Sequence, residues 1–189
     1  MDLIWEGISQ AFWLILNRDP GLMEVVFLSI AVSGSATLLS ILIGVPYGTM
    51  LALRRFAGRN FLLGLVNTGM GMPPVVVGLV LSIFLWRSGP LGFLSLLYTP
   101  AAMVAAQVVI ASPIIAGVSM AAIAQLDPKL RLQMLGLGAS RLQLLGVLFQ
   151  EARLPLLTAV MAGFGGVISE VGSVMMVGGN IMGQTRVLT

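Results

Sequence analysis

Charged residues are scarce in this sequence, and two residue types are missing altogether. Only 9% of the 189 residues are charged and 58% are hydrophobic, which gives a mean hydropathy of +1.03. A soluble domain carries about 25% charged residues, so much of this chain must face lipid. The sequence contains no Cys and no His. This absence excludes disulfides, Cys nucleophiles, imidazole bases and Cys/His metal sites.

The basic residues give a net charge of only +3 and are spread along the chain. We interpret them as markers of membrane topology and expect no nucleic-acid partner. The chain starts MDLIWE, which is acidic where a signal peptide has Lys or Arg, and no small-residue cleavage site follows. We therefore expect the N-terminus to be retained.

Four long stretches are almost free of charge: 25–53, 60–86, 88–126 and 154–185. A membrane crossing needs roughly 20 apolar residues, so each stretch can cross once. The third stretch opens with SGPLGFLSLLYTP, which indicates a loop with a short interfacial segment before a helix over about 100–125. The sequence predicts an all-α membrane protein with four transmembrane helices.

The positions of the basic residues predict how these helices are oriented. Seven of them follow the first span or lie between the third and the fourth, and the positive-inside rule makes that side cytoplasmic. The seven are Arg54, Arg55, Arg59, Lys129, Arg131, Arg141 and Arg153. The remaining three are Arg18, Arg87 and Arg186. The N-terminus is then outside.

The two ends of the chain carry separate expectations. Residues 1–21 form an N-terminal segment in which 3–17 are amphipathic and predict a helix lying on the outer interface; the alternative is an unstructured end. Residues 22–189 form the membrane domain. An even number of spans leaves Thr189 outside, and the sequence stops at VLT, where a further apolar helix is expected.

Small residues repeat at helical spacing in three of the predicted spans. Small residues let membrane helices pack closely, but such a face could also line a pathway for a polar solute, and the pattern alone does not decide. The stripes are Ser29, Ser33, Thr37, Ser40 and Gly44; Ala101, Ala105, Ser112, Ala116 and Ser119; and Ala159, Gly163, Gly166, Glu170 and Ser173.

Glu170 is the one charge inside the four stretches. A carboxylate at membrane depth is costly and usually faces protein or water. It could belong to a gate or a subunit contact, or it could be hydrated near the outer helix end. Pro73-Pro74 and Pro113 break helical hydrogen bonding, either at a cavity or as fixed kinks. The candidate pathway or gate residues are Pro73, Pro74, Ser112, Glu170 and Asn180.

Residues 127–155 predict a helical hairpin on the cytoplasmic side. Asp127 and Pro128 are typical of a helix start, and Gly138 can end that helix in a left-handed conformation. Ser140 and Gln143 have the spacing of a capping box that starts a second helix.

The second hairpin helix is predicted to carry an apolar face of Leu142, Leu145, Leu148 and Phe149. This face could pack back on the transmembrane helices, or part of it could dock on a partner protein. The two uses are compatible. Pro155 then opens the fourth span.

This hairpin resembles the EAA loop of type-1 ABC importer permeases. Gly138-Ala139-Ser140-Arg141 matches its glycine turn, and Leu154-Pro155 matches its end. The sequence departs from the family where Leu132-Gln133-Met134 replaces Glu-Ala-Ala, and the interval from Gly138 to Pro155 is about one helical turn longer.

Two further segments narrow the resemblance to oxyanion permeases. Residues 72–92, MPPVVVGLVLSIFLWRSGPLG, look like the second-span region of molybdate and tungstate permeases. Residues 169–189, SEVGSVMMVGGNIMGQTRVLT, look like the tungstate branch. Members of this family continue for one more helix.

The resemblance implies a mechanism and a set of partners. Two permease copies would form the pathway in a prokaryotic inner membrane, and an extracellular binding protein would deliver tungstate, with molybdate and then sulfate as alternatives. A cytoplasmic ATPase dimer would dock on Gly138, Ala139, Ser140, Arg141 and Leu142. The chain has no G-x-x-x-x-G-K-[ST] sequence, so we expect no ATPase activity of its own. We also expect no catalytic residues, no metal and no cofactor.

Two other functional classes fit the sequence less well. An ATPase-independent secondary transporter or channel would use the stripes and Glu170, but it would have no need of the hairpin. An intramembrane enzyme would need paired carboxylates or a Ser/Lys pair. Since Glu170 is alone within the spans and Lys129 lies outside them, this class is the least favoured.

Overall fold

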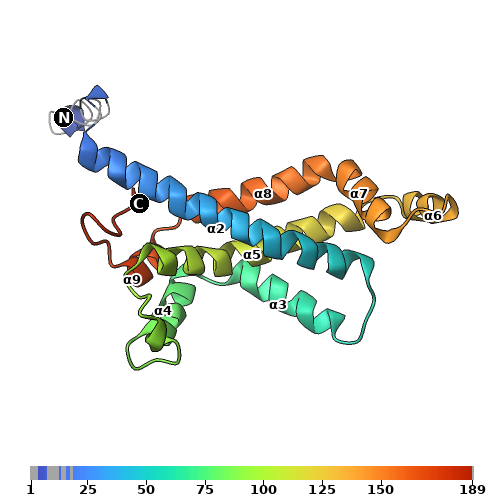
Figure 1. Cartoon of the computed structure of the whole chain (residues 1–189), viewed down its shortest axis with the longest axis horizontal. Helices are drawn as coiled ribbons and strands as arrows, with labels where there is room; N and C mark the ends of the chain where they lie inside the picture. The colour runs from blue at the N-terminus through green and yellow to red at the C-terminus, as the bar shows by residue number, and fades with distance from the viewer. Residues whose placement is uncertain (1–3, 8–12, 14–15, 18, 189) are drawn as a thin grey trace.

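The computed structural model describes residues 4–7, 13, 16–17 and 19–188, and every element in that part of the chain is helical. The elements in chain order are α2 (Pro20–Leu53), α3 (Arg59–Gly71), α4 (Pro74–Leu85), the 3-10 helix η1 (Gly92–Leu94), α5 (Pro100–Ala124), α6 (Pro128–Gly136), α7 (Arg141–Glu151), α8 (Arg153–Ile168) and α9 (Gly172–Gly178). The molecule is elongated, and α6 and α7 lie at the end opposite both termini (Figure 1). The predicted all-α class is confirmed.

Helices α2, α5 and α8 pack together along the long axis, and α3 packs on α5 (Figure 1). Helix α2 has 34 residues, about 51 Å at 1.5 Å per residue, whereas the hydrocarbon core of a bilayer is about 30 Å thick. It starts five residues before the charge-free stretch, because Asp19 caps it by accepting a 3.0 Å hydrogen bond from the Leu22 N–H and Pro20 fits its first position.

The small-residue face of α2 packs closely against α5. A Cβ atom placed on Gly48 would lie 2.3 Å from the Ala116 carbonyl oxygen, and one placed on Gly44 would lie 2.9 Å from the Ile115 side chain. All five residues of the predicted α2 stripe are buried. The stripe packs against α5 at Gly44, as the packing interpretation expects, whereas Ser29 and Ser33 line a cavity.

The second predicted span is not one helix. It consists of α3 and α4, which meet at an angle of 104°. Met72 caps the end of α3 and Pro74 starts α4, because prolines supply no N–H for a continuous helix. The expected break at Pro73-Pro74 is thus present as a sharp bend.

The fourth predicted span is also interrupted. Helix α8 ends at Ile168 and α9 starts at Gly172, so Glu170 and Ser173 do not share the helical face of Ala159 and Gly163. The expected stripe is wrong at those two positions. Among the described residues, α2 and α5 are each long and apolar enough to cross a membrane. The number rises to four if α3 with α4, and α7 with α8, each count as one bent span.

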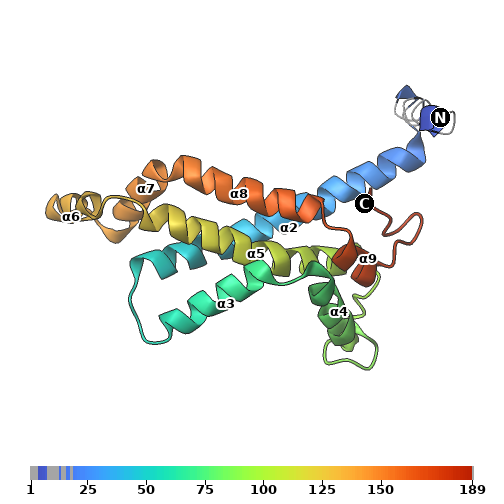
Figure 2. The ribbon, with the colours of Figure 1, turned by 180° about the vertical axis from the view of Figure 1, so that it is seen from behind.

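The two interrupted segments meet where α4 crosses α9 (Figure 2). A Cβ atom on Gly78 of α4 would lie 2.6 Å from the Ser173 Cα atom, and one on Gly172 of α9 would lie 2.6 Å from the Val75 side chain. Glycine at both positions lets the two short helices approach closely, with Gly78 against the backbone of α9 and Gly172 against the Val75 side chain. The breaks that precede α4 and α9 therefore lie on elements that pack together.

The expected loop between the second and third spans is confirmed. It contains only the short η1, and α5 then starts at Pro100 behind the Thr99 cap. Pro113 lies inside α5 without ending it.

The N-terminal segment is described only in part. The described residues 4–7, 13 and 16 are helical, and Trp5 and Trp13 are exposed. Asn17 lies in a turn, and residues 3, 8–12 and 14–15 of the expected interfacial helix lie outside the described residues, as do Arg18 and Thr189. The interfacial position of this segment stays a prediction.

Candidate functional site

The hairpin at one end of the molecule is built as the sequence predicts. The Asp127 carboxylate accepts a 2.8 Å hydrogen bond from the Lys129 N–H and caps α6. Ser140 and Gln143 form both bonds of a capping box at the start of α7. Short side chains with oxygen acceptors favour these positions because they satisfy N–H groups that lack a helical partner.

Gly138 forms the turn between the two hairpin helices in a left-handed conformation, with φ of +78°. The Ala139 N–H donates to the Met134 carbonyl at 3.0 Å, and the Gly138 N–H donates to the Leu135 carbonyl at 3.1 Å. This pair of bonds is a Schellman motif, in which glycine adopts the required conformation without a steric penalty.

The hairpin is anchored to the membrane helices by a different face from the predicted one. Leu144 and Leu148 are buried and pack with Ile123 at the end of α5, whereas Leu142 is 81% exposed. The predicted face is wrong because it included Leu142 and omitted Leu144. The anchoring expectation itself is confirmed, through Leu148 and its neighbours.

Apolar side chains are exposed at the tip of the hairpin. Leu137 is 82% exposed and Leu132 is 69% exposed. The predicted docking residues are Gly138, Ala139, Ser140, Arg141 and Leu142. Ala139 is half-buried and the other four are exposed. Exposed leucines on a rigidly capped turn are typical of a protein contact surface.

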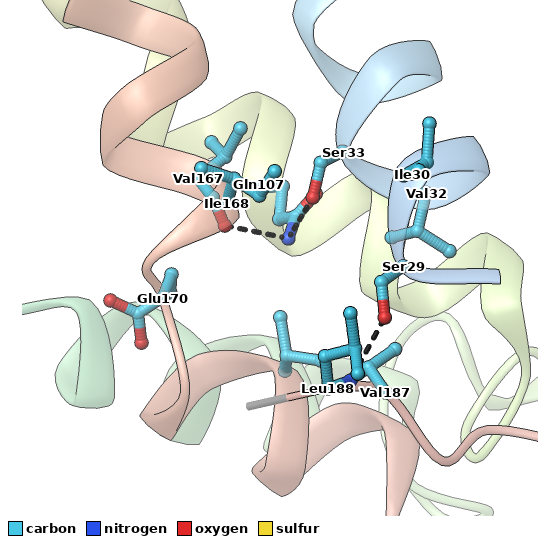
Figure 3. A pocket seen from close by; sticks show the side chains of 11 residues that line it. Ser29, Ile30, Val32, Ser33, Gln107, Val167, Ile168, Glu170, Val187 and Leu188 are labelled. Atoms are coloured by element: carbon cyan, nitrogen blue, oxygen red, sulfur yellow. Dashed lines mark hydrogen bonds between the residues drawn. The ribbon is translucent and has the colours of Figure 1, made fainter. Parts of the chain in front are cut away.

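A second candidate region lies among α2, α5, the end of α8 and α9. It is a cavity of about 150 Å³, called the Gln107 cavity below (Figure 3). The residues that line it are Ser29, Ile30, Val32, Ser33, Gln107, Val167, Ile168, Glu170, Val174, Val187 and Leu188.

Gln107 ties three elements together inside this cavity. Its side chain is 3% exposed, and its Nε2 donates to the Val167 carbonyl at 3.0 Å and to Ser33 Oγ at 3.5 Å. Its Oε1 is buried and has no partner among the described residues. The Ser29 hydroxyl oxygen accepts a 2.9 Å bond from the Leu188 N–H, which ties the segment after α9 to α2 (Figure 3).

Glu170 lies in the break between α8 and α9 and is half-buried. Its Oε1 accepts a 2.8 Å hydrogen bond from the Ser173 N–H, and its carboxylate points away from Gln107 in Figure 3. The carboxylate therefore satisfies a backbone group in the first turn of α9. Its role in a gate stays a prediction.

The structure does not bring all the predicted gate residues together. Ser112 lies in a separate, mainly apolar groove of about 360 Å³ among α2, α3 and α5. Asn180 lies in the turn after α9 with φ of +49°. Pro73 and Pro74 lie at the α3–α4 break, and α4 packs on α9, which follows Glu170.

Sequence reasoning missed Gln107. The signal was present, because a long amide side chain in the middle of an otherwise apolar stretch is rare and usually has a partner inside the bundle. Its partner, however, is a backbone carbonyl 60 residues away in the sequence. No side-chain pattern indicates such a bond.

The sequence of the chain matches a known protein family. Residues 44–189 match the family of binding-protein-dependent transport system inner membrane components. A tungstate uptake system permease protein of Peptoclostridium acidaminophilum is 37% identical over 189 residues, which is 100% of this chain and 83% of the relative.

Two further relatives carry related descriptions. A probable anion ABC transporter permease protein of Haloferax volcanii is 40% identical over 161 residues, which is 85% of this chain and 69% of the relative. A molybdate/tungstate transport system permease protein of Pyrococcus furiosus is 31% identical, over 90% of this chain and 68% of the relative. The chain belongs to the family of binding-protein-dependent transport system inner membrane components, the permeases of ABC importers.

Proposed function

We propose that this permease is the membrane subunit of an ATP-driven tungstate importer. The observation that carries the proposal is the hairpin, whose capped glycine turn holds Leu137 and Leu142 exposed at the end of the molecule. A carrier that works alone has no need of such a surface, whereas an importer must couple its membrane helices to an ATPase.

ATP hydrolysis is assigned to a separate cytoplasmic ATPase dimer, since this sequence has no phosphate-binding loop. The hairpin transmits the movement of the ATPase to the membrane helices through Leu144 and Leu148, which pack on the ends of α2 and α5. Rigid anchoring supports this coupling, because a displacement of the tip then moves the membrane helices instead of bending a loose loop.

The orientation of the chain follows from the same assignment. The hairpin faces the cytoplasm of a prokaryotic cell, together with the α2–α3 turn that carries Arg54, Arg55 and Arg59, in agreement with the positive-inside rule. The opposite end, with α9 and η1, faces an extracellular oxyanion-binding protein. A second copy of the membrane domain, residues 22–189, completes the pathway.

Tungstate is the proposed substrate because a relative that matches the full chain at 37% identity is a tungstate uptake permease. A molybdate/tungstate permease matches at 31%, so molybdate is the alternative. The described residues show no cationic side chain in the Gln107 cavity. Selection among oxyanions is therefore assigned mainly to the binding protein.

The test is the tungsten and molybdenum content of cells with and without this gene, grown on equal low concentrations of both oxyanions and measured by mass spectrometry. The proposal expects a selective loss of tungsten in cells without the gene. Loss of molybdenum alone would replace tungstate by molybdate, and unchanged contents of both metals in cells that accumulate them would remove both substrates.

A further inference from the structure

The Gln107 cavity contains a buried group that no part of the proposed coupling uses. Gln107 is 3% exposed on α5, within the stretch of the bundle that lies closest to α9. Its amide connects α5 to the last turn of α8 through Val167 and to α2 through Ser33. We propose that Gln107 is a gating residue that holds the α9 end of the permease closed through its bond to the Val167 carbonyl. This inference rests on the proposed transport function.

The bond from Gln107 is made to a carbonyl in the last turn of α8. Val167 belongs to the final turn of α8, where carbonyls lack the N–H groups of a continuing helix. Its carbonyl also accepts a 3.2 Å bond from the Glu170 N–H, which lies in the break. The Gln107 amide therefore fixes the point at which α8 stops and the chain turns toward α9.

A second bond closes the other side of the cavity. The Leu188 N–H donates to Ser29 Oγ on α2, while the Ser29 hydroxyl donates to the Val25 carbonyl at 2.7 Å. The segment after α9 is thus tied to α2, as Gln107 ties the segment before it to α5 (Figure 3). The break and α9 lie between these two ties.

Two polar donors that line the cavity are already in use. The Gln107 Nε2 donates to the Val167 carbonyl, and the Ser29 hydroxyl donates to the Val25 carbonyl. Neither donor is available to an oxyanion while these bonds are in place.

Opening of the cavity loses the bond between Gln107 Nε2 and the Val167 carbonyl. A neutral hydrogen bond of this kind shifts the ratio of closed to open states by on the order of threefold to tenfold.

The test uses the natural absence of cysteine. A single reporter, Val174→Cys, is placed on α9, where Val174 is 2% exposed and lines the cavity. A second reporter, Ala122→Cys, is placed near the hairpin end of α5, where Ala122 is 4% exposed. Labelling by a maleimide is measured for the full transporter with its ATPase in nanodiscs, so that both faces are reachable.

The gating variant is Gln107→Met, which keeps the length of the side chain but removes the amide. The matched control is Ser119→Ala, because Ser119 is also buried on α5 but its hydroxyl has no partner among the described residues. Gln107→Met is expected to raise the labelling rate of Val174→Cys about threefold to tenfold and to leave Ala122→Cys unchanged. Ser119→Ala is expected to change neither rate.

Ser29→Ala provides an independent second variant. It removes the tie to Leu188 and is expected to raise labelling of Val174→Cys in the same selective way. ATP hydrolysis without binding protein is expected to rise in Gln107→Met, because an open pathway no longer restrains the ATPase.

Three results would overturn the inference. The first is a labelling rate of Val174→Cys that Gln107→Met leaves unchanged. The second is an equal rise in the labelling rate at both reporters, which would make Gln107 a general packing residue. The third is an effect of Ser119→Ala as large as that of Gln107→Met. The labelling assay needs no substrate. Its outcome is therefore separate from whether tungstate is the cargo.

Discussion

The Glu170 carboxylate accepts a 2.8 Å hydrogen bond from the Ser173 N–H, so the one charged side chain within the fourth apolar stretch secures the helix that follows the break. A carboxylate and an amide oxygen can both accept this bond. Glu170→Gln should therefore keep uptake close to that of the unmodified permease.

Glu170→Ala removes the acceptor and should reduce stability by about 1 kcal/mol, as the loss of a helix cap does, with lower uptake. Thermal unfolding in detergent and uptake in cells check both variants. A Glu170→Gln variant as defective as Glu170→Ala would show that the charge matters, and would assign Glu170 a role other than capping.

The crossing of α2 and α5 predicts a sharp difference between two glycines of one helix. Gly48→Leu should prevent folding, because even a Cβ atom at this position would lie 2.3 Å from the Ala116 carbonyl oxygen. Gly34→Leu, on the same helix, should be tolerated because a Cβ atom at Gly34 meets nothing within 4 Å.

The yield of monodisperse protein after membrane extraction measures this difference. Overpacking in a close-packed interior costs about 1–3 kcal/mol even where side chains can adjust, and the backbone of α5 cannot. Equal yields from the two variants would contradict the described packing of α2 on α5.

Substitutions at two leucines of α7 distinguish the anchoring of the hairpin on the membrane helices from the docking of the ATPase. Leu148 is 3% exposed and Leu142 is 81% exposed. Leu148→Ala should destabilise the permease by about 2–5 kcal/mol, as in other buried sites. Leu142→Ala should leave its thermal stability unchanged but weaken co-purification of the ATPase.

Unfolding temperature and the ratio of ATPase to permease in the purified complex are the two measurements. An unchanged ratio of ATPase to permease in Leu142→Ala would contradict the docking assignment. An unchanged unfolding temperature in Leu148→Ala would contradict the anchoring assignment.

Gly138 offers the strongest local test of the hairpin turn. Gly138→Val places a β-branched residue at φ of +78°, a conformation that costs L-residues roughly 1–2 kcal/mol. The turn should distort and the ATPase should dissociate. Gly136→Ala is the matched control, since a Cβ atom at Gly136 meets nothing within 4 Å and alanine favours the helix.

Gel filtration of the co-expressed subunits distinguishes the two variants. A complex that survives Gly138→Val as well as Gly136→Ala would place the docking surface elsewhere.

The sequence predicts those parts of the fold that depend on local chemistry. Asp127, Gly138 and Ser140 lie where capping rules place them, because each satisfies backbone groups within a few residues of itself. The small-residue face of α2 could be recognised for the same reason, since the spacing of its residues follows the helix itself, although the spacing did not decide between packing and a pathway.

The features that the sequence did not predict depend on distant neighbours. The local sequence did not indicate the break after Ile168, where the Val167 carbonyl accepts a hydrogen bond from Gln107 on another helix. The buried face of α7 was misjudged because Leu142 and Leu144 are equally apolar, and only the position of Ile123 at the end of α5 decides which of them is covered. The bend at Pro73-Pro74 was expected, but its angle of 104° reflects the packing of α4 on α9.

The most direct test of the whole account is tungstate accumulation in proteoliposomes that contain this permease, its ATPase and its binding protein. The account predicts uptake that requires ATP and all three proteins, survives Gly136→Ala and is lost in Gly138→Val. Uptake by the permease alone, driven by an ion gradient without ATP, would contradict it.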